Sequence, residues 1–349
     1  MESDSEHEVS PQEEDRFTFP VGKLQLTGIP PSSCIGDDMR YKGSKTFRAG
    51  ALQANGAGGP VSALVHGWCD AVHDLFLDVS GISETRLSPQ WKHSLVKELF
   101  RQKGYSVISH NRPDSTEHED LSGNSSGVIL GIPSTVPGGL RDPQKDRNGR
   151  AVAASIPFQT SSTLRVVVIY GPTAANSYRF MYSAHGPREE RELLAFATQE
   201  LDSAFHKGIP LLALGDTNAV PSLGMDTEGG HFILREASLA SKLISLGAID
   251  TFRARHPTLR AFSYIHPNGT SSRLDHVWLA APPETDLSIL NAALINDERH
   301  KRDHLFPLVG LGAVSPQIPC PSYCPPMEAH YPAHGRRSLP VQTLGRGQP

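Results

Sequence analysis

The chain has 349 residues, of which 38% are hydrophobic, and a mean hydropathy of −0.32, which is enough apolar material for one large α/β domain or two small ones. The formal charge of −4 arises in the first 16 residues, which contain seven acidic residues and one arginine. The rest of the chain carries a net charge of about +2, which neither requires nor excludes a polyanionic partner. Four scattered cysteines, no apolar run near the roughly 18 residues of a membrane helix and no apolar N-terminal segment exclude a disulfide scaffold and a membrane span and favour an intracellular protein.

The first 46 residues show no regular apolar pattern and are predicted to be mostly disordered. From residue 47 onward, short apolar runs rich in Val, Ile and Leu alternate with loops. Runs of this length are typical of strands that are buried on both faces. The predicted strands lie at 75–83, 126–132, 164–170, 210–216, 274–280 and 305–312.

Three stretches with apolar residues at helical spacing are predicted to be helices. The first spans 88–104, with Ser88 as its N-cap, and the others span 189–208 and 233–247. Residues 134–162 are predicted to be a loop-like insertion, and the proline-rich residues 315–349 a disordered tail. The folded domain is therefore expected to cover 47–314. Its alternating strands and helices predict an α/β fold with enough strands for two packed sheets.

Polar side chains follow or border several of the predicted strands. In a layered sheet such positions converge on one rim, where ligands usually bind. They include carboxylates, amides, a phenol and an imidazole: Asn55, Glu84, Tyr170, Asp216, Asn218, Asp275, Asp303 and His304.

These groups suit the hydrolysis of a phosphate ester. A glutamate can hold a hard divalent cation such as Mg²⁺, which prefers oxygen ligands. An aspartate can orient the attacking water, and a histidine whose tautomer is fixed by a buried aspartate can contact the phosphate or exchange a proton. Because the chain lacks both a serine-centred elbow and a glycine-rich Walker loop, acyl transfer and nucleotide-triphosphate binding are disfavoured.

The ordered series of segments resembles the endonuclease/exonuclease/phosphatase superfamily over about residues 47–314. That superfamily includes apurinic endonucleases, deoxyribonuclease-I-like enzymes and the endonuclease domains of non-LTR retrotransposons. The segments that carry the resemblance are ALQANG, SGISETRL, VVVIYGPT, LLALGDTNA, SRLDHVWL and RDHLFPLV, with SLGAIDTFRARHP and FSYIHPNGT before the fifth. The resemblance implies a four-layered α/β sandwich, in which two packed mixed β-sheets are flanked by helices.

The resemblance also implies a role for each residue of the series. Its metal ligands would be Glu84 and Asp303, and its cofactor Mg²⁺ or Mn²⁺. Asn55 would orient a catalytic group, Tyr170 would hydrogen-bond the phosphate, Asp216 would align the nucleophilic water, Asn218 would contact the phosphate and Asp216, Asp275 would fix the tautomer of His304, and His304 would stabilise the pentacovalent phosphate.

Four basic residues next to these segments are candidate contacts to a DNA backbone. They are Arg86, Arg273, Lys301 and Arg302. The chain departs from the family at several positions. Thr217 stands where the family usually has Phe, Arg302 stands where it often has Ser, and Ala57 stands two residues after Asn55, where the commoner segment Asn-Val-Asn-Gly has a second polar residue.

Tyr170 guides the choice of substrate, because the apurinic and retrotransposon endonucleases resemble this chain in having tyrosine there, whereas the other branches tend to carry histidine. The leading hypothesis is a Mg²⁺-dependent DNA endonuclease most similar to a retrotransposon endonuclease domain, which would act in the nucleus, with no membrane and no obligate protein partner. Two alternatives stay open at this point. One is a phosphatase or phosphodiesterase acting on a small metabolite or lipid headgroup, and the other is an inactive relic of the fold.

Overall fold

The computed structural model describes residues 25–26, 34–43, 45–54, 61–87, 91–112, 126–158, 162–172, 186–229, 238–267, 269–285, 287–296 and 304–312. The chain divides into two units, Met1–Val314 and Ser315–Pro349, and this division coincides with the predicted start of the tail. The second unit lies outside the described residues, as do the first 24 residues. Among the helices within these ranges, none combines the length and apolarity needed to cross a bilayer.

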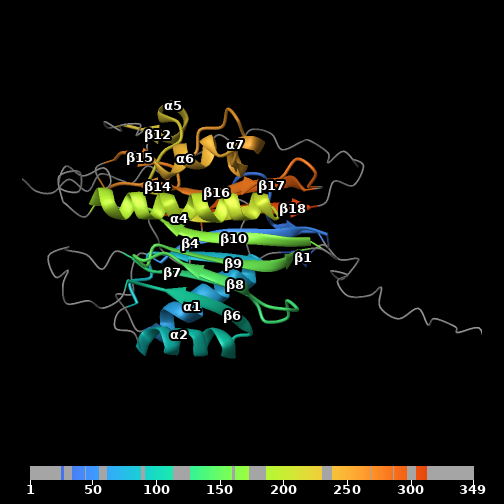
Figure 1. Cartoon of the computed structure of the whole chain (residues 1–349). Coiled ribbons are helices and arrows are strands. Elements are labelled where there is room, and N and C mark those ends of the chain that lie inside the picture. Colours follow the sequence, from blue (N-terminus) through green and yellow to red (C-terminus); the bar gives the residue numbers. More distant parts are fainter. Residues whose placement is uncertain are drawn as a thin grey trace, which may run out of the picture. The chain divides into compact units, whose positions relative to one another are not determined.

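Within the described residues, the larger sheet has seven strands in the order β2-β17-β18-β4-β5-β7-β6 (Figure 1). Only the central pair β4 and β5 is parallel, and the other neighbours are antiparallel. The bounds are β2 Cys34–Gly36, β4 Phe47–Gln53, β5 Val79–Ser83, β6 Tyr105–His110, β7 Val128–Pro133, β17 Ser288–Ile295 and β18 Phe306–Gly312.

The second sheet has six described strands in the order β13-β16-β11-β10-β9-β8. Here β10 and β11 form the parallel pair, flanked by antiparallel neighbours. The bounds are β8 Arg141–Lys145, β9 Ala151–Phe158, β10 Ser162–Tyr170, β11 Leu211–Asp216, β13 Ile249–Asp250 and β16 Asp275–Ala280.

In the part of the chain that the structure describes, four main helices cover the outer faces of the two sheets. Helices α1 (Val61–Asp74) and α2 (Trp91–Gln102) pack on the seven-stranded sheet, and α4 (Gly186–His206) and α6 (Leu239–Ser245) pack on the six-stranded sheet (Figure 1). A third apolar layer lies between the sheets, where valines and leucines of both inner faces meet. The four-layered α/β sandwich is thus confirmed.

Short elements complete the fold around the ends of the long strands. They are β1 Gln25–Leu26, β3 Tyr41–Lys42, α5 Leu223–Asp226, β12 Thr227–Glu228, α7 Thr251–Arg255, β14 Tyr264–Ile265 and β15 Ser271–Ser272. Strands β12, β15 and β14 form a small antiparallel sheet of their own.

The structure corrects the sequence prediction at three places. The loop-like insertion at 134–162 is wrong, because β8 and β9 lie there and β9 is buried between β8 and β10. Helix α1 was not predicted. The domain also begins before residue 47, because β2 pairs with β17 at the edge of the seven-stranded sheet.

The two parallel pairs place polar residues at a common rim. Gln53 lies opposite Ser83 at the carboxyl ends of β4 and β5, so that Glu84 follows directly. Tyr170 lies opposite Asp216 at the carboxyl ends of β10 and β11. Because parallel strands end on the same edge of a sheet, and the two sheets face each other, these ends meet.

Candidate functional site

Asp216, Asp275 and His304 form a buried group at the rim. One carboxylate oxygen from each aspartate and one ring nitrogen of the histidine lie within 4.8 Å of one another. Asp216 and Asp275 are neighbours because β11 and β16 are paired in this register. His304 comes from the opposite sheet, two residues before β18 begins. The predicted residues of both sheets are therefore brought together.

Gln53 joins this group to Glu84. Its side-chain Nε2 donates to Glu84 Oε2 at 2.8 Å and to Asp216 Oδ2 at 3.0 Å, and its Oε1 accepts from the Ser83 hydroxyl. Glu84 and Asp216 are both almost fully buried. A single amide thus holds two carboxylates of different sheets close together, which would otherwise repel each other.

Asp216 is held in a fixed orientation by its own turn. Gly215 precedes it with φ +133°, and a Cβ at Gly215 would lie 2.0 Å from the Ile169 carbonyl oxygen, so only glycine allows β10 and β11 to approach this closely. The backbone N–H of Asn218 donates to Asp216 Oδ1 at 2.8 Å. Burial, and next the charge of Asp275, raise the pKa of Asp216 well above its usual range.

Asp275 and His304 form a buried hydrogen-bonded pair with a distance of 2.6 Å between Oδ2 and Nδ1. The carboxylate favours a proton on Nδ1, so Nε2 is the ring nitrogen that can exchange a proton with a ligand. The Ser263 hydroxyl oxygen accepts from the backbone N–H of Asp275 at 3.0 Å, and the Tyr264 ring lies 4.6 Å from the His304 ring. Sequence reasoning missed both of these supporting residues.

Tyr170 points its hydroxyl into this buried region. The side chain is fully buried, and its hydroxyl has no hydrogen-bond partner among the described residues. Burial, followed by the charges of Glu84 and Asp216, raises the pKa of Tyr170, so the phenol stays protonated and can act as a donor. A buried donor without a partner is costly and suits a site that receives an oxygen-rich ligand.

Backbone strain is concentrated at the same rim. In the described ranges five non-glycine residues have positive φ, and three of them are Glu84 (55°), Arg86 (48°) and Asn218 (47°). The Asn218 side-chain amide donates to the Gly171 carbonyl at 2.8 Å and so ties the end of β11 to the end of β10. Residues in such conformations persist where surrounding contacts enforce them, which is common at functional sites.

Comparisons with known proteins match the fold and not the sequence. No protein-family model matches the chain, and no curated protein does. An AP endonuclease from Leishmania major has a TM-score of 0.59 at 15% identity, covering 77% of this chain and 88% of that one. An AP endonuclease from Archaeoglobus fulgidus has a TM-score of 0.54 at 16% identity, covering 75% and 98%. The human Nocturnin catalytic domain has a TM-score of 0.52 at 14% identity, covering 82% and 100%. The chain has the endonuclease/exonuclease/phosphatase fold.

The contacts of Gln53 give this residue a role that the sequence did not predict. The family resemblance placed Asn55 at the first asparagine of the commoner Asn-Val-Asn-Gly segment, which left Ala57 as a departure. The spacing also fits residues 53–56, where Gln53 takes the place of the first asparagine and Asn55 that of the second. The contacts of Gln53 with Glu84 and Asp216 favour this second alignment, in which no polar residue is lost.

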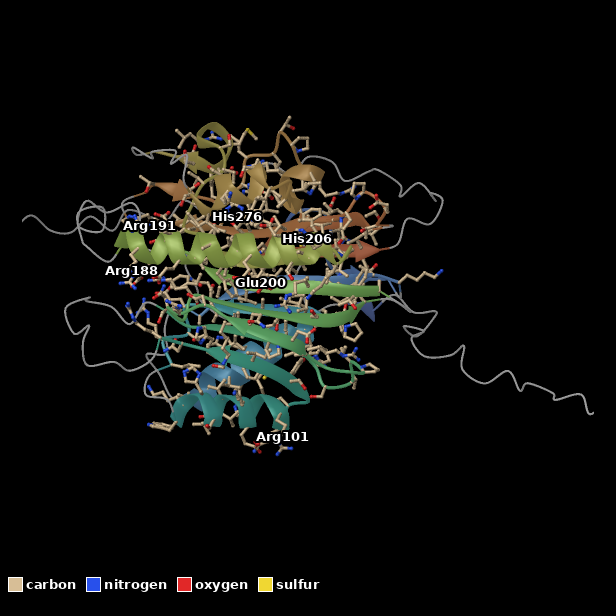
Figure 2. All side chains as sticks on the ribbon, in the orientation of Figure 1. Arg101, Arg188, Arg191, Glu200, His206 and His276 are labelled. Atoms are coloured by element: carbon tan, nitrogen blue, oxygen red, sulfur yellow. The ribbon has the colours of Figure 1, made fainter. Side chains whose placement is uncertain are left out.

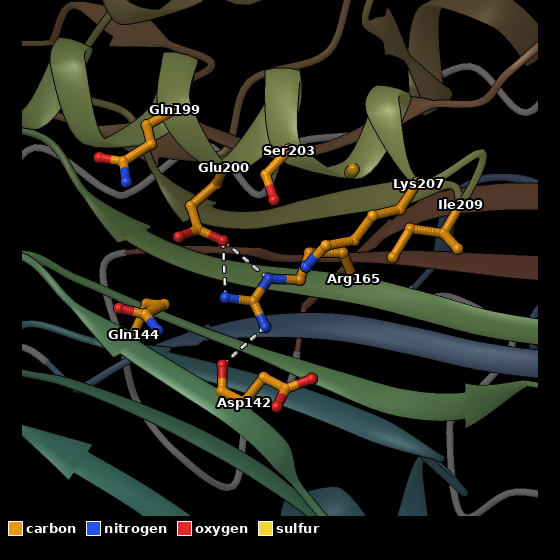
Figure 3. A pocket seen from close by; sticks show the side chains of 9 residues that line it. Asp142, Gln144, Arg165, Gln199, Glu200, Ser203, Lys207 and Ile209 are labelled. Atoms are coloured by element: carbon orange, nitrogen blue, oxygen red, sulfur yellow. Dashed lines mark hydrogen bonds and ion pairs between the residues drawn. The ribbon is translucent and has the colours of Figure 1, made fainter.

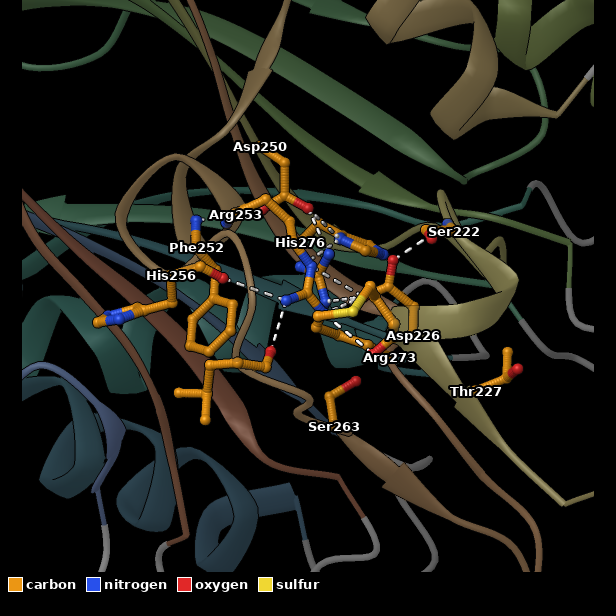
Figure 4. Close-up of polar contacts among 12 residues, drawn as sticks. Ser222, Asp226, Thr227, Asp250, Phe252, Arg253, His256, Ser263, Arg273 and His276 are labelled. Atoms are coloured by element: carbon orange, nitrogen blue, oxygen red, sulfur yellow. Dashed lines mark hydrogen bonds and ion pairs between the residues drawn. The ribbon is translucent and has the colours of Figure 1, made fainter. Parts of the chain in front are cut away.

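The prediction for Arg273 is wrong. Its side chain is fully buried, donating to Asp226 Oδ1 at 2.8 Å and to Asp250 Oδ2 at 2.5 Å (Figure 4). It also lies 3.1 Å from Nδ1 of His276, whose Nε2 is 3.2 Å from the Ala219 carbonyl oxygen. Arg273 therefore stabilises the loops that carry Asp226 and Asp250, and its buried side chain has no surface to offer to a DNA backbone.

Of the remaining predicted residues, the structure describes only Arg86. Arg86 lies at the rim with a half-exposed side chain that forms an ion pair with Glu84. Asn55, Lys301, Arg302 and Asp303 lie outside the described residues, so their roles stay predictions.

The donor set of this site fits a hard divalent cation. Three carboxylates, those of Glu84, Asp216 and Asp275, lie in the same region as the His304 imidazole, with no cysteine among them. Mg²⁺ and Mn²⁺ prefer such oxygen ligands. Among the described residues, the carboxylates that would hold the ion are those of Glu84, Asp216 and Asp275. The predicted ligand Asp303 lies outside the described residues.

A cavity of about 170 Å³ lies elsewhere, between β8, β10 and the C-terminal half of α4 (Figure 3). Its main charged pair is Arg165 and Glu200, which bond to each other at 2.7 Å. Arg165 precedes Tyr170 by five positions on β10, which places the two roughly 17 Å apart along the strand. This cavity therefore does not belong to the site at the rim.

Proposed function

We propose that the chain is a divalent-metal-dependent nuclease that hydrolyses a DNA phosphodiester at the rim. The observation that carries this proposal is the buried pair of Asp275 and His304 beside Asp216, with Gln53 linking Asp216 to Glu84. The buried cluster thus contains a carboxylate that can orient a water, an imidazole that can contact a phosphate oxygen, and oxygen ligands for a cation. The fold shared with two AP endonucleases supports the same chemistry.

Each described side chain has a distinct task in this scheme. Asp216, held by the backbone N–H of Asn218, accepts a hydrogen bond from the attacking water and orients it. His304, whose Nδ1 proton is held by Asp275, donates from Nε2 to a phosphate oxygen when its ring is protonated on both nitrogens. Tyr170 donates its hydroxyl to another phosphate oxygen, which gives this buried donor its partner. A bound divalent cation would supply charge neutralisation at the phosphate.

Two further observations support DNA as the substrate. A structure with this fold from Neisseria, at 16% identity and a TM-score of 0.54, is described as a 3′ phosphatase bound to a product DNA hairpin. Tyr170 is the residue in which the chain resembles the apurinic and retrotransposon endonucleases. We therefore place the substrate closest to that of these nuclease branches, with the retrotransposon endonuclease domains as the nearest type.

Incubation with supercoiled plasmid tests the proposal. Nicking is expected in Mg²⁺ or Mn²⁺, to fall at least about tenfold after chelation, and to return when either ion is restored, because the rim carboxylates need a counter-charge to accept a phosphate. The conversion of supercoiled to open circular DNA on a gel gives the rate. Full activity after exhaustive chelation would contradict the metal requirement. Hydrolysis of a small phosphate ester without any nicking would contradict the DNA substrate.

Gln53→Leu is expected to lower the nicking rate by about tenfold, because Glu84 and Asp216 lose the amide that holds them in register, and supporting residues of this kind typically contribute factors of 10–100. Gln102→Leu is the matched control, since Gln102 also donates from Nε2 to a glutamate but lies on the exposed face of α2. Initial rates of both variants at saturating Mg²⁺ provide the measurement. Equal rates for the two variants would show that the Gln53 contacts do not matter.

A further inference from the structure

Several arginines gather where α4 begins, and one of them lies beside Tyr170. Arg150 is buried, with its guanidinium carbon 5.4 Å from the centre of the Tyr170 ring, and it bonds Glu189 at 3.2 Å. Arg112 reaches Glu189 from the other side at 2.7 Å. One glutamate on α4 thus holds two arginines next to a residue of the proposed site.

The next turn of α4 repeats this arrangement closer to the surface. Glu192 accepts from Arg188 at 2.9 Å and from the Asn148 amide at 2.8 Å. The Arg188 hydrogen bond, then that of Asn148, lower the pKa of Glu192, with the charge of Arg147 adding to the effect. Arg147 is exposed, and it lies close enough to Glu192 for its charge to act on that carboxylate.

We name Arg112, Arg147, Arg150 and Arg188 the arginine cluster. The ion pairs of the cluster among the described residues are with Glu189 and Glu192, so within this set four positive charges are matched by two negative ones. Among the described residues, Arg188 donates only through Nε, and its two terminal nitrogens have no partner. Figure 2 shows Arg188 and Arg191 together at this end of α4.

We propose that the arginine cluster is a binding subsite for the phosphates of a nucleic-acid strand that continues past Tyr170. Planar guanidinium groups with unused donors bind phosphate oxygens in a bidentate manner. The glutamates hold the arginines in place before a strand arrives, which lowers the ordering cost of binding. Arg150 connects the subsite to the reaction centre through the Tyr170 ring. The inference rests on the proposed nuclease function, and it assigns to this cluster the backbone contact that Arg273 cannot make.

The test is binding of a fluorescently labelled DNA duplex by fluorescence anisotropy, without divalent metal, between about 50 and 200 mM salt. The double variant R147A/R188A is expected to bind at least about fivefold more weakly at low salt. The slope of log affinity against log salt is expected to shrink by roughly 0.9 for each phosphate that the variant no longer neutralises. The double control R101A/R141A removes the same charge from two exposed arginines, Arg101 on α2 (Figure 2) and Arg141 on β8, and is expected to bind like the wild type.

Three results for the variants would overturn the inference. The first two are an unchanged salt slope of DNA affinity in R147A/R188A and an equal loss of DNA affinity in the control R101A/R141A. The third is weaker binding of R147A/R188A to anionic phospholipid vesicles while its DNA affinity stays intact. If the wild type fails to bind DNA even at the lowest salt, the subsite is again refuted. Metal-dependent hydrolysis of bis(p-nitrophenyl) phosphate by the wild type then decides separately whether the hydrolytic site itself is active. Thermal melting of each variant confirms that it is folded.

Discussion

His304→Ala is expected to cut DNA at least about a hundredfold more slowly than the wild type, with the loss in kcat. The imidazole is the group that can donate to the phosphate as charge develops, and positioned groups of this kind contribute roughly 10²–10⁴ in rate. Asp216→Asn is expected to cost as much, because an amide orients the water less well than a carboxylate. Single-turnover cleavage of a labelled duplex separates kcat from binding.

The matched control is His206→Ala, because His206 also uses Nδ1 in a hydrogen bond, to the Asp202 carbonyl, but lies exposed near the end of α4 (Figure 2). Circular dichroism should show that the His304 and Asp216 variants keep the wild-type fold. Cleavage by both variants within a few fold of the wild-type rate would mean that the reaction centre lies elsewhere.

Arg273→Ala is expected to lower the free energy of unfolding by about 3–5 kcal/mol, which is the usual cost of leaving a buried partner charge uncompensated. The substitution would leave Asp250 without its arginine partner and Asp226 with Arg253 alone. Urea unfolding followed by tryptophan fluorescence provides the measurement. Arg255→Ala is the control, because Arg255 pairs with Asp37 at the surface, where such pairs contribute about 0–1 kcal/mol.

The stability cost of Arg273→Ala is also expected to depend on pH in a definite direction. Burial alone would raise the pKa of Asp226, but the charge and hydrogen bonds of Arg273 overcome it and the pKa is lowered. A depressed folded-state pKa stabilises the protein above the ordinary aspartate range, and that stability is lost as pH falls through the folded value. In Arg273→Ala the cost should be smaller at pH 5 than at pH 7, since protonation of a buried carboxyl relieves its unpaired charge. A cost that is the same at both pH values would contradict the buried ion pairs.

Much of the sandwich could be predicted because strands that are buried on both faces of a sheet appear in the sequence as short apolar runs. The segments ending at Tyr170 and Asp216 became β10 and β11, and their polar last residues marked the rim. The meeting of Asp275 with His304 was predicted through the family resemblance, since 29 positions separate them and local pattern carries no such information.

The elements and the residue that the sequence analysis predicted wrongly or left out also have specific physical causes. Strand β9 is rich in alanine and contains serine and proline, and β8 is polar and fully exposed, so neither shows an apolar run. Helix α1 did carry a signal, because Val65, Trp68, Cys69 and Val72 follow helical spacing and are all buried. Arg273 was misjudged because its neighbours in the sequence face the site, whereas its partner Asp226 lies 47 positions away.

Strand β16 carries two adjacent residues whose side chains contact different clusters on opposite faces of the strand. Asp275 bonds His304 on the side of the rim, and His276 contacts Arg273 and the Ala219 carbonyl on the side of the buried ion pairs. Side chains alternate along a strand, so removing one residue within 274–280 would exchange these two sides. Such a deletion would abolish cleavage and weaken folding together. Natural variation in chain length should accordingly spare β16.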